Sequence, residues 1–114
     1  METSKFSEII EMLTSATEKN SINWTEVNKD FNTSVSGCKI SVSSCFDSFT
    51  NEYYVSVAFF NDEGVQFDKE LLYQASDEMY NEVMKLYNLI SDKYYKKTES
   101  ENKILNGLKG LLEQ

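Results

Sequence analysis

Carboxylates are the side chains in this sequence with the most capacity for chemistry. The 114 residues include 19 Asp and Glu against 11 basic residues, all lysine, for a formal net charge of −8. Eight acids fall between residues 52 and 82, where Lys69 is the only basic residue: Glu52, Asp62, Glu63, Asp68, Glu70, Asp77, Glu78 and Glu82. On one side of the fold they would form an acidic surface that speeds encounter with a basic protein and repels nucleic acid. The alternative is a solvated face plus acids that compensate a helix dipole.

Two residue types that much catalysis requires are missing. The chain has no histidine and no arginine, which excludes Ser/His/Asp and Cys/His nucleophile systems, histidine-containing zinc sites and a guanidinium clamp on phosphate. Its four glycines are scattered and form no phosphate loop, and the acids lack EF-hand spacing. We therefore expect no enzyme, no metal and no cofactor. A carboxylate-dependent hydrolase is the minor alternative.

The cysteines and the N-terminal residues indicate a reducing compartment. Cys38 and Cys45 lie in one expected strand, in which seven residues span about 23 Å, beyond disulfide reach. The first residues lack the basic and apolar regions of a signal peptide, and no apolar run is long enough to span a membrane. We expect a cytoplasmic protein with reduced thiols and no membrane partner.

Two hydrophobic periods define the elements that must position these residues. Apolar side chains at helical spacing over residues 6–16 predict an amphipathic helix that ends near Asn20, and residues 21–25 alternate as a brief extended segment. Alternation over 31–35 and 38–44, joined by Ser36 and Gly37, predicts a hairpin. Residues 53–59 give the clearest strand. It is followed by a turn at 61–64 and a returning strand that begins with Val65 and Phe67, which makes an antiparallel meander of three to four strands.

The C-terminal third returns to helical periodicity. Apolar residues from Tyr80 to Tyr94 predict a long helix, and a capping box at Thr98 and Glu101 predicts the start of a short last helix, in which Gly107 and Gly110 each cost about 1 kcal/mol relative to alanine. The apolar set of that helix is Ile104, Leu105, Leu108, Leu111 and Leu112. Residues 1–114 thus form a single α+β domain, with the first and long helices on one face of the sheet. The last helix either docks beside them or is held out for a partner.

Tyrosine recurs every seven residues at Tyr73, Tyr80, Tyr87 and Tyr94. This is typical of a core stripe, and the alternative is a self-association face. The candidate self-association residues combine this seam with the last helix: Tyr80, Tyr87, Tyr94, Leu105, Leu108 and Leu112. The segment 93–97 is basic and aromatic, but the negative field of the whole chain opposes binding to nucleic acid, so we expect no nucleic-acid partner.

Several short motifs resemble one group of proteins. They are Ala16-Thr17 followed by Ile22-Asn23-Trp24, the alternating hairpin, the Asn61-Asp62-x-Gly64 turn, and the Tyr80 to Tyr87 helix segment. Together they resemble a group of small uncharacterised proteins of bacteria and their phages. The resemblance implies a cytosolic bacterial or phage protein and no particular activity.

The sequence therefore favours a non-enzymatic protein-interaction module. In the first hypothesis, a small acidic protein binds another protein, and it inhibits or sequesters a basic partner through the acidic residues 52–82. In the second hypothesis, the chain is a structural or regulatory homodimer formed through the tyrosine seam or the last helix.

Overall fold

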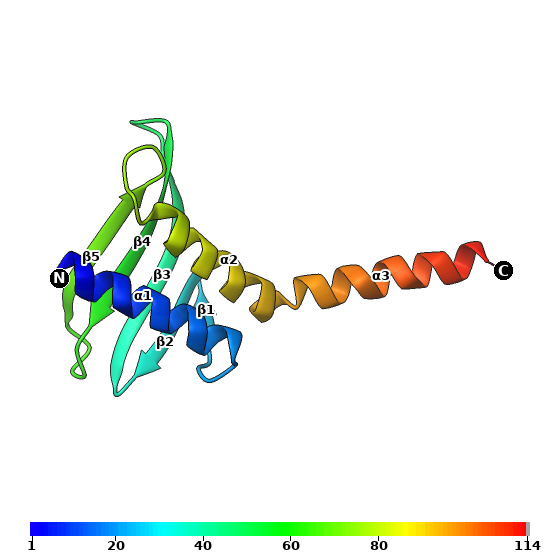
Figure 1. Cartoon of the computed structure of the whole chain (residues 1–114), viewed down its shortest axis with the longest axis horizontal. Coiled ribbons are helices and arrows are strands. Elements are labelled where there is room, and N and C mark those ends of the chain that lie inside the picture. The colour runs from blue at the N-terminus through cyan, green and yellow to red at the C-terminus, as the bar shows by residue number, and fades with distance from the viewer. Residues whose placement is uncertain (114) are drawn as a thin grey trace.

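The structure is a computed structural model that describes residues 1–113, and it confirms the predicted α+β fold (Figure 1). A helix is followed by five strands and then by two helices. The elements are α1 (Thr3–Glu18), β1 (Thr25–Val27), β2 (Asp30–Val35), β3 (Cys38–Asp47), β4 (Glu52–Phe60), β5 (Gln66–Tyr73), α2 (Tyr80–Tyr95) and α3 (Lys97–Leu112).

The five strands form one antiparallel meander in the order β1-β2-β3-β4-β5. The sheet has one strand more than the upper limit of the predicted three to four. Residues 21–24 of the expected extended segment do not pair, and strand β1 begins only at Thr25, after Trp24. Strand β4 lies between β3 and β5 in the sheet. In the predicted turn at 61–64, which joins β4 to β5, Gly64 adopts a φ of 82°.

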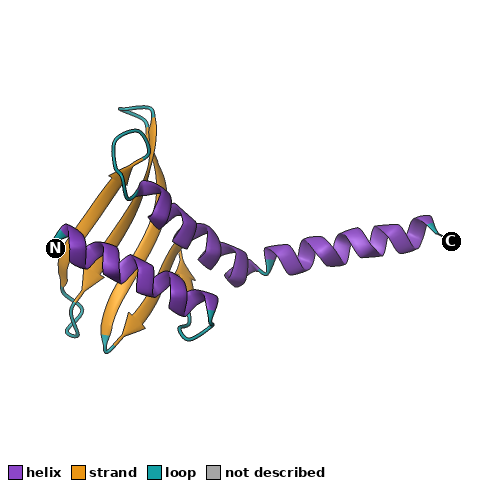
Figure 2. Ribbon diagram, viewed as in Figure 1, coloured by secondary structure: helices purple, strands orange, loops and turns teal. Residues whose placement is uncertain are grey.

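Helices α1 and α2 cover one face of the sheet, as the sequence predicted (Figure 2). The core between these layers comes from inward positions on the strands and from the apolar stripes of both helices. Its fully buried side chains include Ile10, Phe31, Val42, Val57 and Leu86. The alternating residues predicted for the hairpin and for β4 therefore face the helices.

Helix α1 ends through a left-handed residue and a tryptophan contact. Asn20 has a φ of 56°, as its position after the helix predicted, and the Ser21 amide donates to the Ala16 carbonyl. The buried Thr17 hydroxyl donates to the Leu13 carbonyl and accepts a hydrogen bond of 3.1 Å from Trp24 Nε1. These bonds attach the chain after α1 to the end of the core.

Helix α3 projects away from the domain, and the chain changes direction between α2 and α3 (Figure 1). None of its residues from Lys97 to Leu112 is buried. The radius of gyration is 16.9 Å, whereas a compact chain of this length has a value of about 13 Å. Of the two placements left open by the sequence, the helix held out from the domain is the observed one.

The predicted capping box at the start of this helix is wrong. Helix α3 begins at Lys97, one residue before Thr98, and only Lys96 separates it from α2. Lys96 adopts a left-handed φ of 54°. The Thr98 hydroxyl donates to Asp92 Oδ1 at 2.7 Å, and the Thr98 amide donates to the same oxygen at 3.2 Å. In a capping box the Glu101 carboxylate would accept the hydrogen bond from the Thr98 amide. Here Asp92 of α2 accepts that bond instead.

None of the helices within residues 1–113 combines the length and the apolar composition that a membrane span requires.

Candidate interaction site

A large exposed apolar surface lies on α3. Its apolar side chains are between 50% and 86% exposed. At about 100° per residue they cover one face of the helix, and Asn106 lies on the opposite face. We call this set the α3 stripe; its members are Ile104, Leu105, Leu108, Leu111 and Leu112. A contiguous apolar face of this kind indicates an interaction site.

The base of α3 is fixed to the domain by polar contacts. Lys93 Nζ donates to the Glu18 carbonyl at 3.1 Å and to Asn20 Oδ1 at 3.0 Å, which joins the end of α2 to the end of α1. The Tyr95 hydroxyl donates to Glu26 Oε2 on β1. Together with the Asp92 bonds to Thr98, these contacts set the direction in which the α3 stripe leaves the domain.

The contact between Tyr95 and Glu26 gives a pH-dependent expectation. The hydrogen bond to the Glu26 carboxylate raises the pKa of Tyr95 to about 12, above its model-peptide value of about 10. A raised pKa means that the folded state favours the protonated phenol. This contribution to stability is therefore complete below about pH 10 and is lost as pH rises towards 12. Titration of the seven tyrosines by absorbance at 295 nm should show a late component that Tyr95→Phe reduces. Part of it should remain, because burial or neighbouring groups also raise the pKa values of Tyr54, Tyr73 and Tyr87.

A control variant and a contradicting outcome test whether Tyr95 is a group with a raised pKa. Tyr53→Phe is the control, because it removes the hydroxyl of another exposed tyrosine ring on the domain. An unchanged upper limb of the titration curve in Tyr95→Phe would show that Tyr95 does not hold the raised pKa.

The eight predicted acidic residues do not form one continuous surface. Asp62 and Glu63 lie in the turn between β4 and β5, and Glu52 lies at the start of β4, at the other end of the sheet. Glu52 Oε1 accepts a bond from the Ala75 amide at 2.7 Å, and Asp77 Oδ2 accepts one from the Tyr73 amide at 2.6 Å. These two carboxylates thus hold the loop that leads into α2.

Three of the acids do come together. Glu70, Asp77 and Glu78 line a hollow of about 400 Å³ beside Met1 and Thr3. Asp68 lies on the same strand, and its Oδ2 is 2.8 Å from the Met1 amino group, which holds the pKa of Asp68 below its usual value. Glu82 lines a separate hollow between α1 and α2. Among residues 1–113, Asp68 is the only one of the eight acids with an ion-pair partner.

The tyrosine seam belongs mostly to the core. Tyr80 is 8% exposed and Tyr87 packs against the buried cluster, so the side chain of Tyr80 is not at the surface for self-association. The Phe31 ring contacts both Tyr87 and Tyr94, with centroid distances of 5.4 and 5.7 Å. Of the predicted self-association residues, Tyr94, Leu105, Leu108 and Leu112 are the exposed ones.

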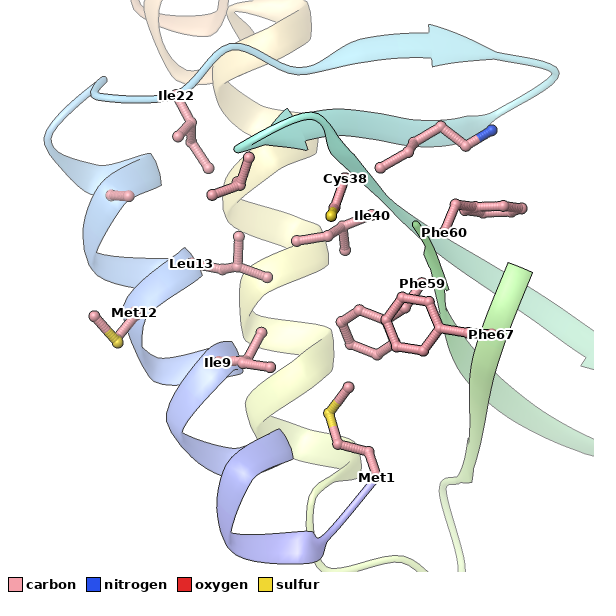
Figure 3. A pocket seen from close by; sticks show the side chains of 13 residues that line it. Met1, Ile9, Met12, Leu13, Ile22, Cys38, Ile40, Phe59, Phe60 and Phe67 are labelled. Atoms are coloured by element: carbon pink, nitrogen blue, oxygen red, sulfur yellow. The ribbon is translucent and has the colours of Figure 1, made fainter. Parts of the chain in front are cut away.

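The sequence interpretation missed a second apolar feature, a groove between α1 and the end of the sheet (Figure 3). Its volume is about 460 Å³. Ile9 and Leu13 of α1 face Ile40 and Phe59 of the sheet across it, and Cys38 lies further along the same side (Figure 3). Met12, Val35 and Phe67 on its rim are between 43% and 64% exposed. We call it the α1 groove.

One signal in the sequence could have indicated this groove. Met12 falls outside the predicted apolar face of the first helix, and Val35 ends a strand next to a turn, so both add apolar surface where a simple two-layer core does not need it.

Within residues 1–113 the thiols form no disulfide and the carboxylates form no metal-binding group. Cys38 and Cys45 are both free and lie on β3, as predicted, with side chains on opposite faces because they are an odd number of residues apart. In the part of the chain from residue 1 to 113, no group of three or more Cys, Asp or Glu side chains is arranged to hold a metal ion.

No protein-family model, no curated protein and no solved structure matches this chain. The fold and the two apolar surfaces are therefore the basis on which a function can be proposed.

Proposed function

We propose that this chain is a non-enzymatic protein-interaction module that binds through the α3 stripe. The observation that supports the proposal is the exposure of five large apolar side chains on a helix that contributes nothing to its own core. Burying a leucine side chain is worth about 1.5–3 kcal/mol, so a partner that covers the stripe gains a large apolar contact. An amphipathic helix laid into an apolar groove is a common mode of protein recognition.

The intrinsic stability of α3 supports the same conclusion. Isolated helices of about this length are marginal in water, and Gly107 and Gly110 each cost about 1 kcal/mol relative to alanine. A β-carbon at either glycine would meet nothing within 4 Å in the chain. Packing inside the domain therefore explains neither glycine. At about 100° per residue Gly107 borders the α3 stripe, where a partner backbone could approach closely, whereas Gly110 lies on the opposite face.

The test compares two variants of the chain, one with new charge on the α3 stripe and one with new charge on the opposite face of α3. Leu105→Glu with Leu108→Glu places two carboxylates in the α3 stripe, and Asn106→Glu is the control on the opposite face. Charges in an apolar contact should weaken binding by at least about 100-fold, equivalent to about 2.7 kcal/mol. Light scattering over a concentration series reports self-association, and capture followed by mass identification reports other partners.

Stripe-dependent self-association or stripe-dependent capture supports the proposal. If the wild-type chain is monomeric and captures no protein that the double variant fails to capture, the proposal is wrong.

The acidic residues favour a second candidate, the sequestration of a basic partner. Glu70, Asp77 and Glu78 share one hollow, and none of them has an ion-pair partner among residues 1–113. Uncompensated charge of one sign raises association rates at low ionic strength.

Neutralising part of this charge should separate the two candidates. Glu70→Gln, Asp77→Asn and Glu78→Gln together should lower capture of a basic partner about 10-fold at low salt and flatten its salt dependence, and an asparagine oxygen can still accept the bond from the Tyr73 amide. Asp68 stays unchanged because it pairs with the Met1 amino group. Capture at low and high salt is the measurement, and equal salt dependence in the triple variant and the wild type would exclude the electrostatic candidate.

A further inference from the structure

Two apolar surfaces of this chain lack a cover within residues 1–113, and they match each other. The α3 stripe covers about 12 Å of helix from Ile104 to Leu112, and the α1 groove follows about 10 Å of α1 from Ile9 to Ala16. The stripe consists of aliphatic side chains, and the facing walls of the groove at Ile9, Leu13, Ile40 and Phe59 are also apolar. The length and the chemistry of the stripe therefore suit the groove.

A chain cannot place its own stripe in its own groove in this fold. Lys96 is the only residue between α2 and α3, and the bonds from Thr98 to Asp92 hold α3 away from the domain. Figure 1 shows α3 leaving from the end of α2 that lies away from Met1, whereas Met1 itself lines the α1 groove. A helix that fills the groove must come from another molecule.

Charge favours a second copy of the same chain as that molecule. Residues 1–82 hold fifteen carboxylates and five lysines, whereas helix α3 (Lys97–Leu112) holds two carboxylates and three lysines. The turn that carries Asp62 and Glu63 lies beside the end of the groove, because a β-carbon on Gly37 would be 3.5 Å from that of Asp62. Lys109, which lies beside the α3 stripe at about 100° per residue and has no ion-pair partner among residues 1–113, would approach this acidic end.

We propose that the α3 stripe of one copy docks in the α1 groove of a second copy. This inference rests on the proposed function, since it names the partner of the same stripe. A reciprocal arrangement about a two-fold axis covers both stripes and both grooves at once, and it closes the assembly. Gly107, which borders the stripe, then allows close approach of the α3 backbone to the groove wall.

A disulfide trap that uses the native thiol of the groove tests this contact directly. Cys38 lines the α1 groove and Cys45 lies on the opposite face of the sheet, so Cys45→Ser leaves one native thiol in place. Leu105→Cys, Leu108→Cys and Leu112→Cys are added one at a time to the full-length chain, because they sample successive positions along the stripe. Asn106→Cys, on the opposite face of α3, is the matched control. After mild oxidation, mass spectrometry of unreduced digests identifies each bridge.

The position of the bridge decides the result. A covalent dimer that joins Cys38 to at least one of the three stripe positions, and is absent from Asn106→Cys, supports docking in the groove. Bridges only between two introduced thiols would show that α3 pairs with α3, and the absence of any Cys38 bridge would show that the groove does not receive the stripe. Either outcome overturns this inference, and the proposed function still stands if capture or self-association remains stripe-dependent.

A second pair of variants gives an independent readout. Met12→Glu with Val35→Glu puts charge on the exposed groove rim and leaves α3 intact. Self-association measured by light scattering should fall as far as it does in the Leu105→Glu and Leu108→Glu variant. Phe49→Glu, at a fully exposed apolar residue outside the groove lining, is the control. Unchanged self-association in the rim variant would contradict docking in the groove.

Discussion

Phe31→Ala should remove a large part of the stability of the domain. The Phe31 side chain is 1% exposed, and its ring lies 5.4 Å from Tyr87, 5.7 Å from Tyr94 and 6.1 Å from Tyr95 between ring centroids. Replacing a buried phenylalanine with alanine costs about 3–5 kcal/mol, because the transfer free energy is lost and a cavity remains. A domain of this size has a free energy of unfolding of about 5–15 kcal/mol in total.

Urea denaturation provides the measurement. With a slope of about 1–3 kcal/mol per molar urea, the midpoint for Phe31→Ala should fall by about 2 M. Phe49→Ala removes the same ring from a side chain that is 99% exposed, so its free energy of unfolding should change by less than about 0.5 kcal/mol. Equal midpoints for the two variants would show that the contacts of Phe31 with the α2 tyrosines are not part of the stable core.

The location of Phe31 links this substitution to the proposed interaction site. Its ring packs under the C-terminal half of α2, where Lys93 and Tyr95 fix the base of α3. A cavity at Phe31 should therefore loosen the junction that directs the α3 stripe. The stability of the core and the direction of the α3 stripe therefore both depend on the C-terminal half of α2.

The sequence predicted the parts of the fold in which hydrophobic period and burial agree. The alternation of Phe31, Thr33 and Val35, and of Val55, Val57 and Phe59, is that of strands with one face on a core, and the structure confirms both. It did not predict the full extent of β5, in which Asp68, Lys69 and Glu70 are all charged. Charged residues are common on an edge strand, where they discourage pairing with other sheets, so they weaken the periodic signal there.

The eight acidic residues are close together in the sequence but lie apart in the structure. Strand β5 places Asp68 and Glu70 on the helix-covered face and Lys69 on the other, and its length separates the turn at Asp62 from the loop at Asp77. The stretch of eight acids therefore divides among two hollows, a turn and a loop. Net charge is a property of the sequence, but a charged patch depends on strand direction and register.

The start of α3 could not be predicted because it depends on a residue of the preceding helix. Thr98 and Glu101 have the spacing of a capping box, yet the Thr98 hydroxyl bonds to Asp92. The α1 groove could not be predicted either, since its walls come from α1, the β2–β3 hairpin, β4 and β5. Pairings of this kind involve tertiary neighbours, which local periodicity does not describe.

Breaking the α3 stripe should produce the largest change in backbone dynamics in this chain. Helix α3 buries no side chain within its own chain and carries two glycines, so alone it should open readily. When its stripe is covered by a partner, opening α3 requires exposing those leucines to water, and its amides should be protected from hydrogen exchange.

Hydrogen exchange measured by mass spectrometry resolves this difference peptide by peptide. At concentrations where the wild-type chain is associated, Leu105→Glu with Leu108→Glu should lower the protection of α3 amides by about 100-fold or more, equivalent to about 2.7 kcal/mol. Amides of β3 and β4 should be unchanged, because every α3 residue lies outside the buried core. Asn106→Glu is the control, with the same kind of charge on the opposite face. Equal protection of α3 in the stripe variant and the wild type would mean that the helix is stable without any partner, and the reason for assigning the stripe an interaction role would be lost.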